Sequence, residues 1–165
     1  LGNKNIDMGD YKNIIAPLLD HWLFVNFEPL AVEHMMSIPD KSVGGQLDLL
    51  GYEIDPITSK KTLRLIDLKT KSNIRSGFYK RENDKEGRLW VKEIDKYWKE
   101  PYSTDKQLGC YIEMLKLNYG IVPDVCNTLW AYPGFSILGH SQPVQRCSAA
   151  WQEAWQKFEA KQELF

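Results

Sequence analysis

Cysteine is scarce in this chain of 165 residues, which contains only Cys110, Cys126 and Cys147. The three are odd in number and lie 16 and 21 residues apart. This spacing fits neither a disulfide framework nor the closely spaced pairs of a zinc site. We therefore expect buried or incidental thiols.

Long hydrophobic runs are also missing. No stretch approaches the roughly 20 uncharged apolar residues that cross a bilayer, and the first residues show no cationic run followed by an apolar core. We expect no membrane partner and a soluble, intracellular protein. With 43% apolar residues, the chain can build one complete core and is too short for two. A single domain over residues 1–165 is expected, and the start at Leu1 without methionine leaves open an upstream segment.

A strong net charge is the third absence. The formal charge of −1 gives no global electrostatic case for nucleic acid, because such binders usually display a basic excess. The local distribution is different: residues 69–106 hold eleven lysines and arginines against seven acids, a net charge of +4. This excess begins at Lys69. An ordinary solvated surface explains it equally well, because surfaces carry charges of both signs.

Apolar spacing and turn residues predict seven elements. They are a helix at 10–27, strands at 29–38, 42–54 and 61–70, a helix at 103–118, a strand at 125–132 and a helix at 148–163. Residues 55–60 are expected to join two strands as a hairpin loop, and Trp151 and Trp155 to lie in the core. This order predicts an α/β fold whose mixed sheet contains a three-stranded meander flanked by helices.

The strand at 61–70 carries an acid and a base among apolar residues. Asp67 and Lys69 lie two apart and share one face, while Leu68 points the opposite way into apolar packing. Charged residues are almost never fully buried without partners. A buried ion pair is one explanation, although such pairs seldom add net stability. A catalytic pair is the other.

Asp48, on the neighbouring strand, is the second acid. Alone, an aspartate at a strand end most often bonds a turn. Beside Asp67 it predicts a metal site, in which both carboxylates and the Leu68 carbonyl bind Mg²⁺, with Mn²⁺ as a substitute. Lys69 would then orient the attacking water and balance the charge that develops during phosphodiester hydrolysis.

Further residues fit around this centre. Gln107 and Tyr111 lie four apart on one helix face, where an amide and a phenol can bond the lysine, the water or a phosphate. Glu33 lies mid-strand and is either a third carboxylate or an exposed strand residue. Gly44 and Gly45 allow close approach by a backbone or by substrate.

In this order, Gly45-x-x-Asp48, Asp67-x-Lys69 and Gln107-x-x-x-Tyr111 resemble the RecB-like branch of the P-D-(D/E)-x-K nuclease superfamily. The surrounding pattern, over about residues 29–119, is similar to phage exonucleases and to the family of the mitochondrial genome maintenance exonuclease. The resemblance implies a restriction-endonuclease-like core. It does not extend to the histidine that many members place on an upstream helix, because His21 and His34 lie too close to Glu33 to be identified with it.

The resemblance implies metal binding by Asp48 and Asp67, a catalytic Lys69, an accessory Glu33, and a site shaped by Gln107 and Tyr111. It also implies DNA as the partner and a cytoplasmic role in a bacterial or phage-infected cell. The most favoured function is a Mg²⁺-dependent exonuclease in DNA repair, recombination or phage DNA processing. The alternatives are a catalytically silent nucleic-acid-binding domain and a site-specific endonuclease.

The region from Lys69 to Gln107 has the composition of a groove for single-stranded nucleic acid, with basic residues for phosphates and aromatic rings for bases. Lys71 and Arg75 follow the catalytic strand and are expected to bind substrate. The aromatic residues are Phe78, Tyr79, Trp90, Tyr97, Trp98 and Tyr102. Structural packing of these rings remains an equal alternative.

Overall fold

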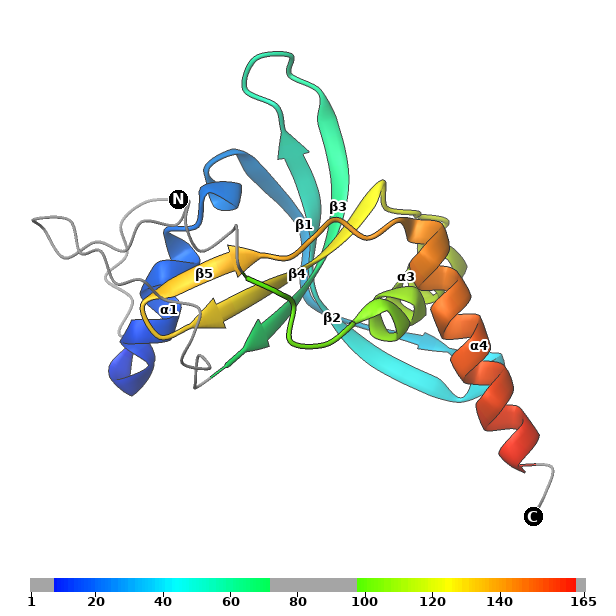
Figure 1. Cartoon of the computed structure of the whole chain (residues 1–165). Coiled ribbons are helices and arrows are strands. Elements are labelled where there is room, and N and C mark those ends of the chain that lie inside the picture. The colour runs from blue at the N-terminus through cyan, green and yellow to red at the C-terminus, as the bar shows by residue number, and fades with distance from the viewer. Residues whose placement is uncertain (1–7, 72–97, 163–165) are drawn as a thin grey trace, which may run out of the picture.

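The computed structural model describes residues 8–71 and 98–162, which form a five-stranded sheet covered by helices on both faces (Figure 1). Short 3₁₀ turns precede the sheet and link its first two strands. The elements are η1 (Gly9–Tyr11), α1 (Lys12–Leu19), η2 (Trp22–Asn26), β1 (Phe27–Ile38), η3 (Pro39–Lys41), β2 (Val43–Ile54), β3 (Lys61–Thr70), α3 (Asp105–Tyr119), β4 (Val125–Tyr132), β5 (Phe135–Leu138) and α4 (Val144–Gln162).

The strands lie in sequence order across the sheet, β1-β2-β3-β4-β5. All neighbouring pairs are antiparallel except β3 and β4, which are parallel. A parallel pair needs a crossover connection, and α3 lies in the connection between these two strands. The predicted α/β class, mixed sheet and three-stranded meander are therefore confirmed.

Three apolar clusters pack on the sheet, and one of them lies on β4 and β5. On one face α3 packs against β1, β2 and β3 through residues such as Leu47, Leu65 and Leu108. On the other, Leu23 from η2 packs against Ile66 and Leu129. Side chains alternate between the two faces of a strand, and the central strands β3 and β4 carry apolar residues on both. The sheet therefore buries apolar residues on each side.

Helix α4 lies on α3, outside the sheet (Figure 1). The two helices touch at Gly109, where an added Cβ would come within 2.0 Å of the Cys147 carbonyl oxygen. Trp151 packs against the main core, whereas Phe158 is 49% exposed. Of the two tryptophans expected in the core, Trp151 therefore reaches it. Trp155 is half-buried against the rings of Trp151 and Phe158, because the later turns of α4 extend past α3.

The secondary structure differs from the sequence prediction in three places. The helix expected over 10–27 ends at Leu19, and β1 begins at Phe27, where the chain pairs with Glu53. Apolar spacing persists through this stretch because Phe24 and Phe27 still pack on the sheet. The terminal helix begins at Val144, four residues before the predicted start, and β5 was not predicted.

Strand β5 is a short edge strand that follows a tight turn. Gly134 takes a φ of 89° in this turn, a conformation that glycine adopts without strain. Phe135 stacks on Tyr132 with ring centroids 4.7 Å apart. The four-residue strand is too short to show a readable alternation, which explains why the sequence pattern missed it.

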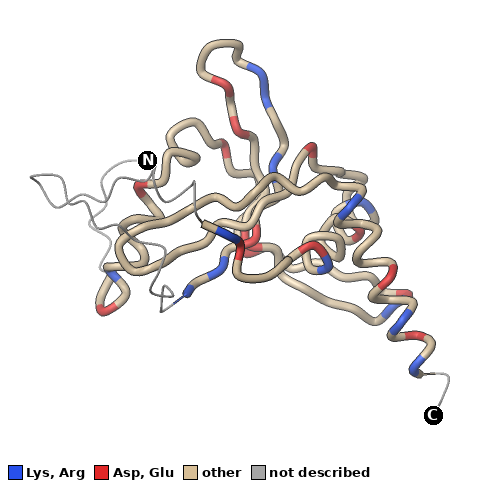
Figure 2. Tube along the Cα trace, in the orientation of Figure 1, with Lys and Arg blue, Asp and Glu red and all other residues tan. Residues whose placement is uncertain are grey.

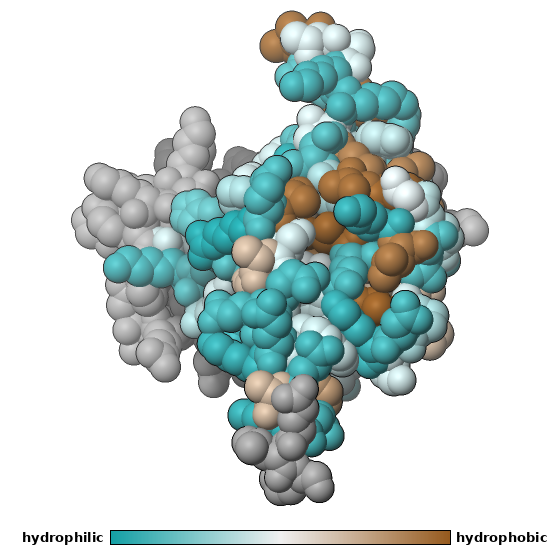
Figure 3. Space-filling model, turned by 90° about the vertical axis from the view of Figure 1, so that its right-hand side faces the viewer, coloured by the Kyte–Doolittle hydropathy of each residue, from teal (hydrophilic) through white to brown (hydrophobic). Residues whose placement is uncertain are grey.

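Basic and acidic residues alternate along the described chain, and blue segments mark the end of β3 (Figure 2). Apolar side chains gather on the face seen in Figure 3. The exposed apolar residues include Leu117 and Val122, near the carboxyl end of α3. No helix within the described ranges is both long and apolar enough to cross a membrane.

Candidate active site

The sheet splits between β2 and β3 at the two predicted acids. The β2–β3 ladder ends at the pair Leu49 and Ile66. Beyond it β2 continues with β1 alone, and β3 continues with β4 alone, so the two strands diverge (Figure 1). The first residues past the last pair are Asp48 and Asp67. A fork in the sheet therefore holds both carboxylates.

Asp48 stabilises this fork with its side chain. Its Oδ2 accepts a hydrogen bond of 2.6 Å from the backbone N–H of Leu68, which has lost a strand partner on this side. The alternation of side chains that an ideal strand shows is broken here, because Leu47 and Leu50 both join the core beneath α3. The fork breaks the two-residue period and turns Asp48 toward β3.

Asp67 is fully buried. Its Oδ1 accepts a hydrogen bond of 3.0 Å from Lys69 Nζ, and its Oδ2 lies 2.9 Å from the same nitrogen. Within the described part of the chain, Oδ2 accepts no hydrogen bond. Burial raises the pKa of Asp67 to about 6 against the opposing effect of Lys69, and the neighbouring Asp48 raises it further. The negative charge of this carboxylate is thus only partly balanced by Lys69.

Lys69 is held by helix α3 as well as by β3. Its Nζ donates a hydrogen bond of 2.9 Å to Gln107 Oε1, and Gln107 Nε2 donates one of 2.8 Å to the Tyr111 hydroxyl. The predicted residues therefore form one chain of contacts from Asp67 to Tyr111. Burial raises the pKa of the Tyr111 phenol, so it stays protonated at neutral pH.

Gly45 allows α3 to lie this close to β2. A Cβ at Gly45 would stand 3.3 Å from Tyr111 Cε1 and 3.4 Å from Met114 Cε. The close approach predicted for this glycine is therefore made by side chains of α3. At Gly44 the nearest atom would be the Met36 carbonyl oxygen at 3.9 Å, so that position is open.

Glu33 lies on β1, opposite Asp48. The pairs Val32 with Leu49 and His34 with Leu47 flank it and fix this register. Its φ is 50°, and its exposed carboxylate accepts a hydrogen bond from Gln46 Nε2. The three acids thus follow one row across β1, β2 and β3, with Glu33 turned to Gln46.

The structure describes only one of the two residues that were predicted to bind substrate. Lys71 continues β3 by donating its N–H to the Ala131 carbonyl at 2.9 Å. Arg75 lies outside the described residues, as do Phe78, Tyr79, Trp90 and Tyr97. Trp98 and Tyr102 are described, and both pack on Trp130.

The donor set offers oxygen ligands: two carboxylates and the Leu68 carbonyl. Among the described residues, no group of three or more histidine, cysteine or acidic side chains is placed to hold a metal ion. The buried Asp67 Oδ2 and the raised pKa show a negative charge that Lys69 leaves partly uncompensated. A divalent cation that prefers oxygen ligands fits these residues.

The described histidines near this region have structural contacts. His21 Nδ1 accepts a hydrogen bond of 3.2 Å from the Leu23 N–H, and burial lowers its pKa to about 4. His34 Nε2 lies 2.6 Å from the Tyr119 hydroxyl. Cys126 and Cys147 are buried and all three thiols are free, as the cysteine spacing predicted.

Some residues at the site were missed by sequence reasoning. Gln46 contacts Glu33, and Thr128 stands beside Asp67 in the β3–β4 register, bonding the Thr104 hydroxyl at 2.5 Å. Trp130 pairs with Lys69 in that register. Only the pairing of β3 with β4 could have identified the last two.

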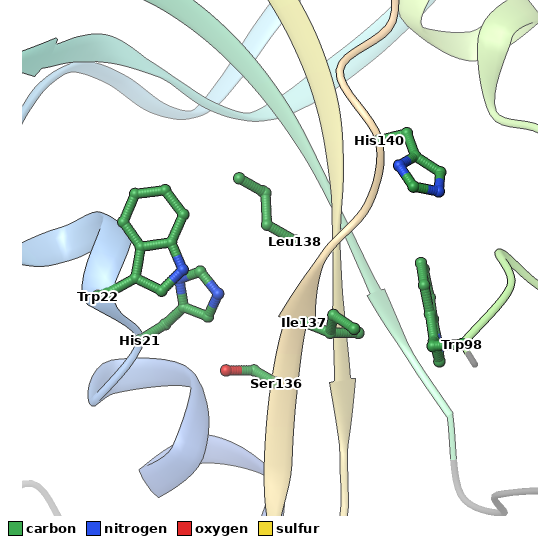
Figure 4. Close-up of a pocket in the computed structure, with 7 residues that line it drawn as sticks. All are labelled: His21, Trp22, Trp98, Ser136, Ile137, Leu138 and His140. Atoms are coloured by element: carbon green, nitrogen blue, oxygen red, sulfur yellow. The ribbon is translucent and has the colours of Figure 1, made fainter. Parts of the chain in front are cut away.

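A separate hollow of about 310 Å³ lies along β5 and shares no lining residue with this site (Figure 4). His21 and Trp22 line one side of the strand, and Trp98 and His140 the other. The candidate site itself lies at the fork between β2 and β3. Neither a protein-family model nor a curated protein matches the chain.

Proposed function

We propose that this protein is a Mg²⁺-dependent DNA nuclease with a restriction-endonuclease-like core. One observation carries the proposal: a fully buried Asp67, beside Asp48, contacts Lys69, which α3 holds through Gln107. Buried acids with raised pKa values gather at functional sites more often than elsewhere. The resemblance of the motifs to RecB-like nucleases supports the same reaction class.

Mg²⁺ would be held by Asp48, Asp67 and the Leu68 carbonyl. When bound, it would neutralise charge on the scissile phosphate and lower the pKa of a water molecule. Mn²⁺ would take the same oxygen ligands. Glu33, in the same row of the sheet, would contribute as an accessory acid that accepts hydrogen bonds from water.

Lys69 has one donor to spare. An ammonium group has three N–H donors, and the hydrogen bonds to Asp67 and Gln107 use two of them. The third can donate to an attacking water or to a phosphate oxygen. Because two fixed partners orient the group, little reorganisation is needed when negative charge develops on the phosphate.

Gln107 and Tyr111 position this lysine. The hydroxyl of Tyr111 accepts the Gln107 amide hydrogen, which directs the Gln107 carbonyl oxygen toward Lys69. The role of Tyr111 is therefore to orient Gln107. Exonuclease activity, and a role inside the cell in repair, recombination or phage DNA processing, are supported by the family resemblance.

A cleavage assay tests the proposal. End-labelled single- and double-stranded DNA is incubated with Mg²⁺ or Mn²⁺ and wild type, Lys69→Ala or Lys61→Ala. Lys61 lies on the same strand but is exposed and pairs with Glu28, so its variant should cleave like wild type. Loss of an electrostatic donor costs on the order of 10²–10³-fold in rate, which is the loss expected for Lys69→Ala.

Wild-type cleavage no faster than that of Lys69→Ala would reject the enzyme. Binding of DNA without cleavage would then support the silent nucleic-acid-binding domain. Circular single-stranded DNA in the same assay separates the two enzyme classes, because only an endonuclease can open it. We expect linear substrates to be degraded and circles to persist.

A further inference from the structure

A cation and two aromatic rings lie together where β3 ends. We call Lys71, Tyr102 and Trp130 the aromatic platform. Lys71 Nζ stands 4.5 Å from the centroid of the Tyr102 ring and 5.9 Å from that of Trp130. The two rings meet edge to face, with centroids 5.0 Å apart.

The aromatic platform adjoins the candidate active site. Trp130 is the β4 partner of Lys69 in the parallel register. Lys71 follows Lys69 by two residues, so both side chains leave the strand on the same side. Tyr102 lies three residues before α3, the helix that supplies Gln107. A strand of nucleic acid bound at Lys69 would therefore meet these rings next.

Only part of the platform is open to solvent. Trp130 is fully buried, whereas 46% of the Tyr102 surface is exposed. Trp130 packs edge to face against Tyr102, and nearly half of the Tyr102 residue is open to solvent. Exposed rings on a rigid support are what single-strand binding proteins use to stack bases.

The charge of Lys71 distinguishes it from the other lysines that lie over aromatic rings. Lys41 stands over Trp151 and Trp155 but pairs with Glu113 at 2.7 Å. Lys61 stands over Tyr52 and pairs with Glu28 at 2.7 Å. Among the residues that the structure describes, no carboxylate pairs with Lys71. An ammonium group has three N–H donors, so Lys71 can donate to a phosphate oxygen while it lies near the two rings.

We propose that the aromatic platform binds single-stranded DNA beside the catalytic fork, with Lys71 on a backbone phosphate and Tyr102 stacked on a base. The inference rests on the proposed nuclease function and names the form of its substrate. Duplex DNA cannot use the platform in this way, because its base faces are stacked inside the helix. The platform thus selects unpaired strands or frayed ends.

Equilibrium binding without cleavage tests this subsite. Fluorescence anisotropy follows labelled single-stranded DNA and a hairpin duplex, both in EDTA, with wild type, Tyr102→Leu, Tyr102→Phe and Lys71→Gln. Tyr102→Leu should weaken single-strand binding about tenfold, as loss of one stacked base does, and Tyr102→Phe should bind like wild type. Lys71→Gln should lower the slope of log K against log salt by about 0.7.

Matched controls come from the same elements. Tyr119→Leu removes a 51% exposed tyrosine from the far end of α3, and Lys61→Gln removes an exposed lysine from the beginning of β3. Both should bind like wild type. Equal binding by Tyr102→Leu and wild type, or an equal loss for single strands and duplex, would overturn the proposal.

Photocrosslinking keeps the test independent of variant folding. Wild type is irradiated with single-stranded DNA containing 5-iododeoxyuridine, and the adducts are mapped by mass spectrometry. An adduct at Tyr102 is expected, and adducts confined to other residues would refute the subsite. If wild type and Lys69→Ala cleave equally but Tyr102 still governs binding, the nuclease proposal fails and the platform stands.

Discussion

Strand β3 carries two buried polar networks, and they differ in how completely their charges are paired. Arg64 donates to Glu53 through Nε at 3.1 Å and through Nη2, and to Asn127 through Nη1. Asn127 in turn donates to the Gly139 carbonyl at 2.9 Å. Three residues further along the strand, Asp67 keeps one buried oxygen without a hydrogen bond.

The surroundings of the two networks explain this difference. Arg64 lies where β3 is paired on both sides, with Gly51 and with Val125. Asp67 lies past the end of the β2–β3 ladder, paired with Thr128 alone. Where β3 is paired on both sides, the neighbouring strands supply hydrogen-bond partners for its polar side chains. At the fork, where β2 has diverged from β3, fewer of these partners are within reach. The incomplete network is therefore the one at which we propose that a cation and a phosphate bind.

The largest expected effect is a difference in the free energy of unfolding between variants of Arg64 and variants of Lys69, the cations of the two networks. Arg64→Met leaves Glu53 and Asn127 without their partner, and removing one member of a buried pair costs about 3 kcal/mol. Lys69→Met leaves Asp67 alone, but that carboxyl can take up a proton. With a pKa already at about 6, protonation limits the cost at pH 7 to about 1.4 kcal/mol.

Urea unfolding of both variants at pH 7 and pH 5 measures this contrast. At pH 5 Asp67 is already protonated in wild type, so Lys69→Met should approach wild-type stability while Arg64→Met stays destabilised. Lys61→Met, at an exposed lysine, serves as the control. Equal losses for Arg64→Met and Lys69→Met at both pH values would contradict the comparison.

The second prediction concerns how Asp67 links stability to pH. Its pKa is raised from 3.8 to about 6 by burial, so the folded state binds the proton more tightly than the unfolded state. Stability is then lost as pH rises through this window. Relative to Asp67→Asn, wild type should lose about 2 kcal/mol of unfolding free energy between pH 4 and pH 7 in EDTA.

The comparison with Asp67→Asn removes contributions that both proteins share. The lowered pKa of His21, about 4, acts in the opposite direction, because stability falls as His21 is forced to take up a proton in acid. It cancels in the difference between the two proteins. A difference that is flat with pH would show that Asp67 does not resist ionisation.

Much of the candidate site follows from two simple periodicities. The two-residue period of a strand places Asp67 and Lys69 on one face, and the four-residue spacing of a helix places Gln107 with Tyr111. The structure adds the contact between Lys69 and Gln107 at 2.9 Å. These predictions succeeded because they need only local geometry.

The fork, the Arg64 network and the place of Trp130 beside Lys71 and Tyr102 could not be predicted in this way. Each depends on where a ladder ends or on which strand lies beside β3. In the sequence Arg64 is an ordinary charged residue of a strand. Its hydrogen bond to Asn127 forms only because β4 lies parallel beside β3. Tyr102 and Lys71 were expected in a groove for single-stranded nucleic acid, but Trp130 joins them only because β4 lies beside β3.

The third prediction asks whether a cation completes the network at the fork. A ligand at ten times its dissociation constant stabilises the folded state by about 1.4 kcal/mol. Mg²⁺ should therefore raise the melting temperature of wild type at pH 7 in a saturable way. Asp67→Asn should lose the shift, because it lacks the carboxylate that would bind the cation.

Asp40→Asn is the matched control for this titration, because Asp40 is an exposed acid in η3. It should keep the wild-type shift. Calorimetric titration of Mg²⁺ into wild type at pH 5 and pH 7 adds a second measurement. Weaker binding at pH 5 is expected since the proton and the cation compete for Asp67. An equal shift in wild type and Asp67→Asn would place the cation elsewhere.

The smallest effect is expected at the far end of the incomplete network. Tyr111→Phe removes the hydroxyl that accepts the Gln107 amide hydrogen at 2.8 Å and keeps the ring packed on Gly45. Gln107 can then rotate, and Lys69 loses part of its orientation. Loss of one neutral hydrogen bond, about 1 kcal/mol, predicts roughly a fivefold lower kcat with little change in KM.

Gln107→Leu separates orientation from mere packing at this position. An aliphatic side chain fills the same space but bonds neither Lys69 nor the Tyr111 hydroxyl, so the double variant with Tyr111→Phe should be no slower than Gln107→Leu alone. Additive losses would mean that the two residues act independently. The kinetic series therefore decides whether the contacts from Lys69 to Tyr111 work as one chain, as the geometry indicates, or as neighbours without coupling.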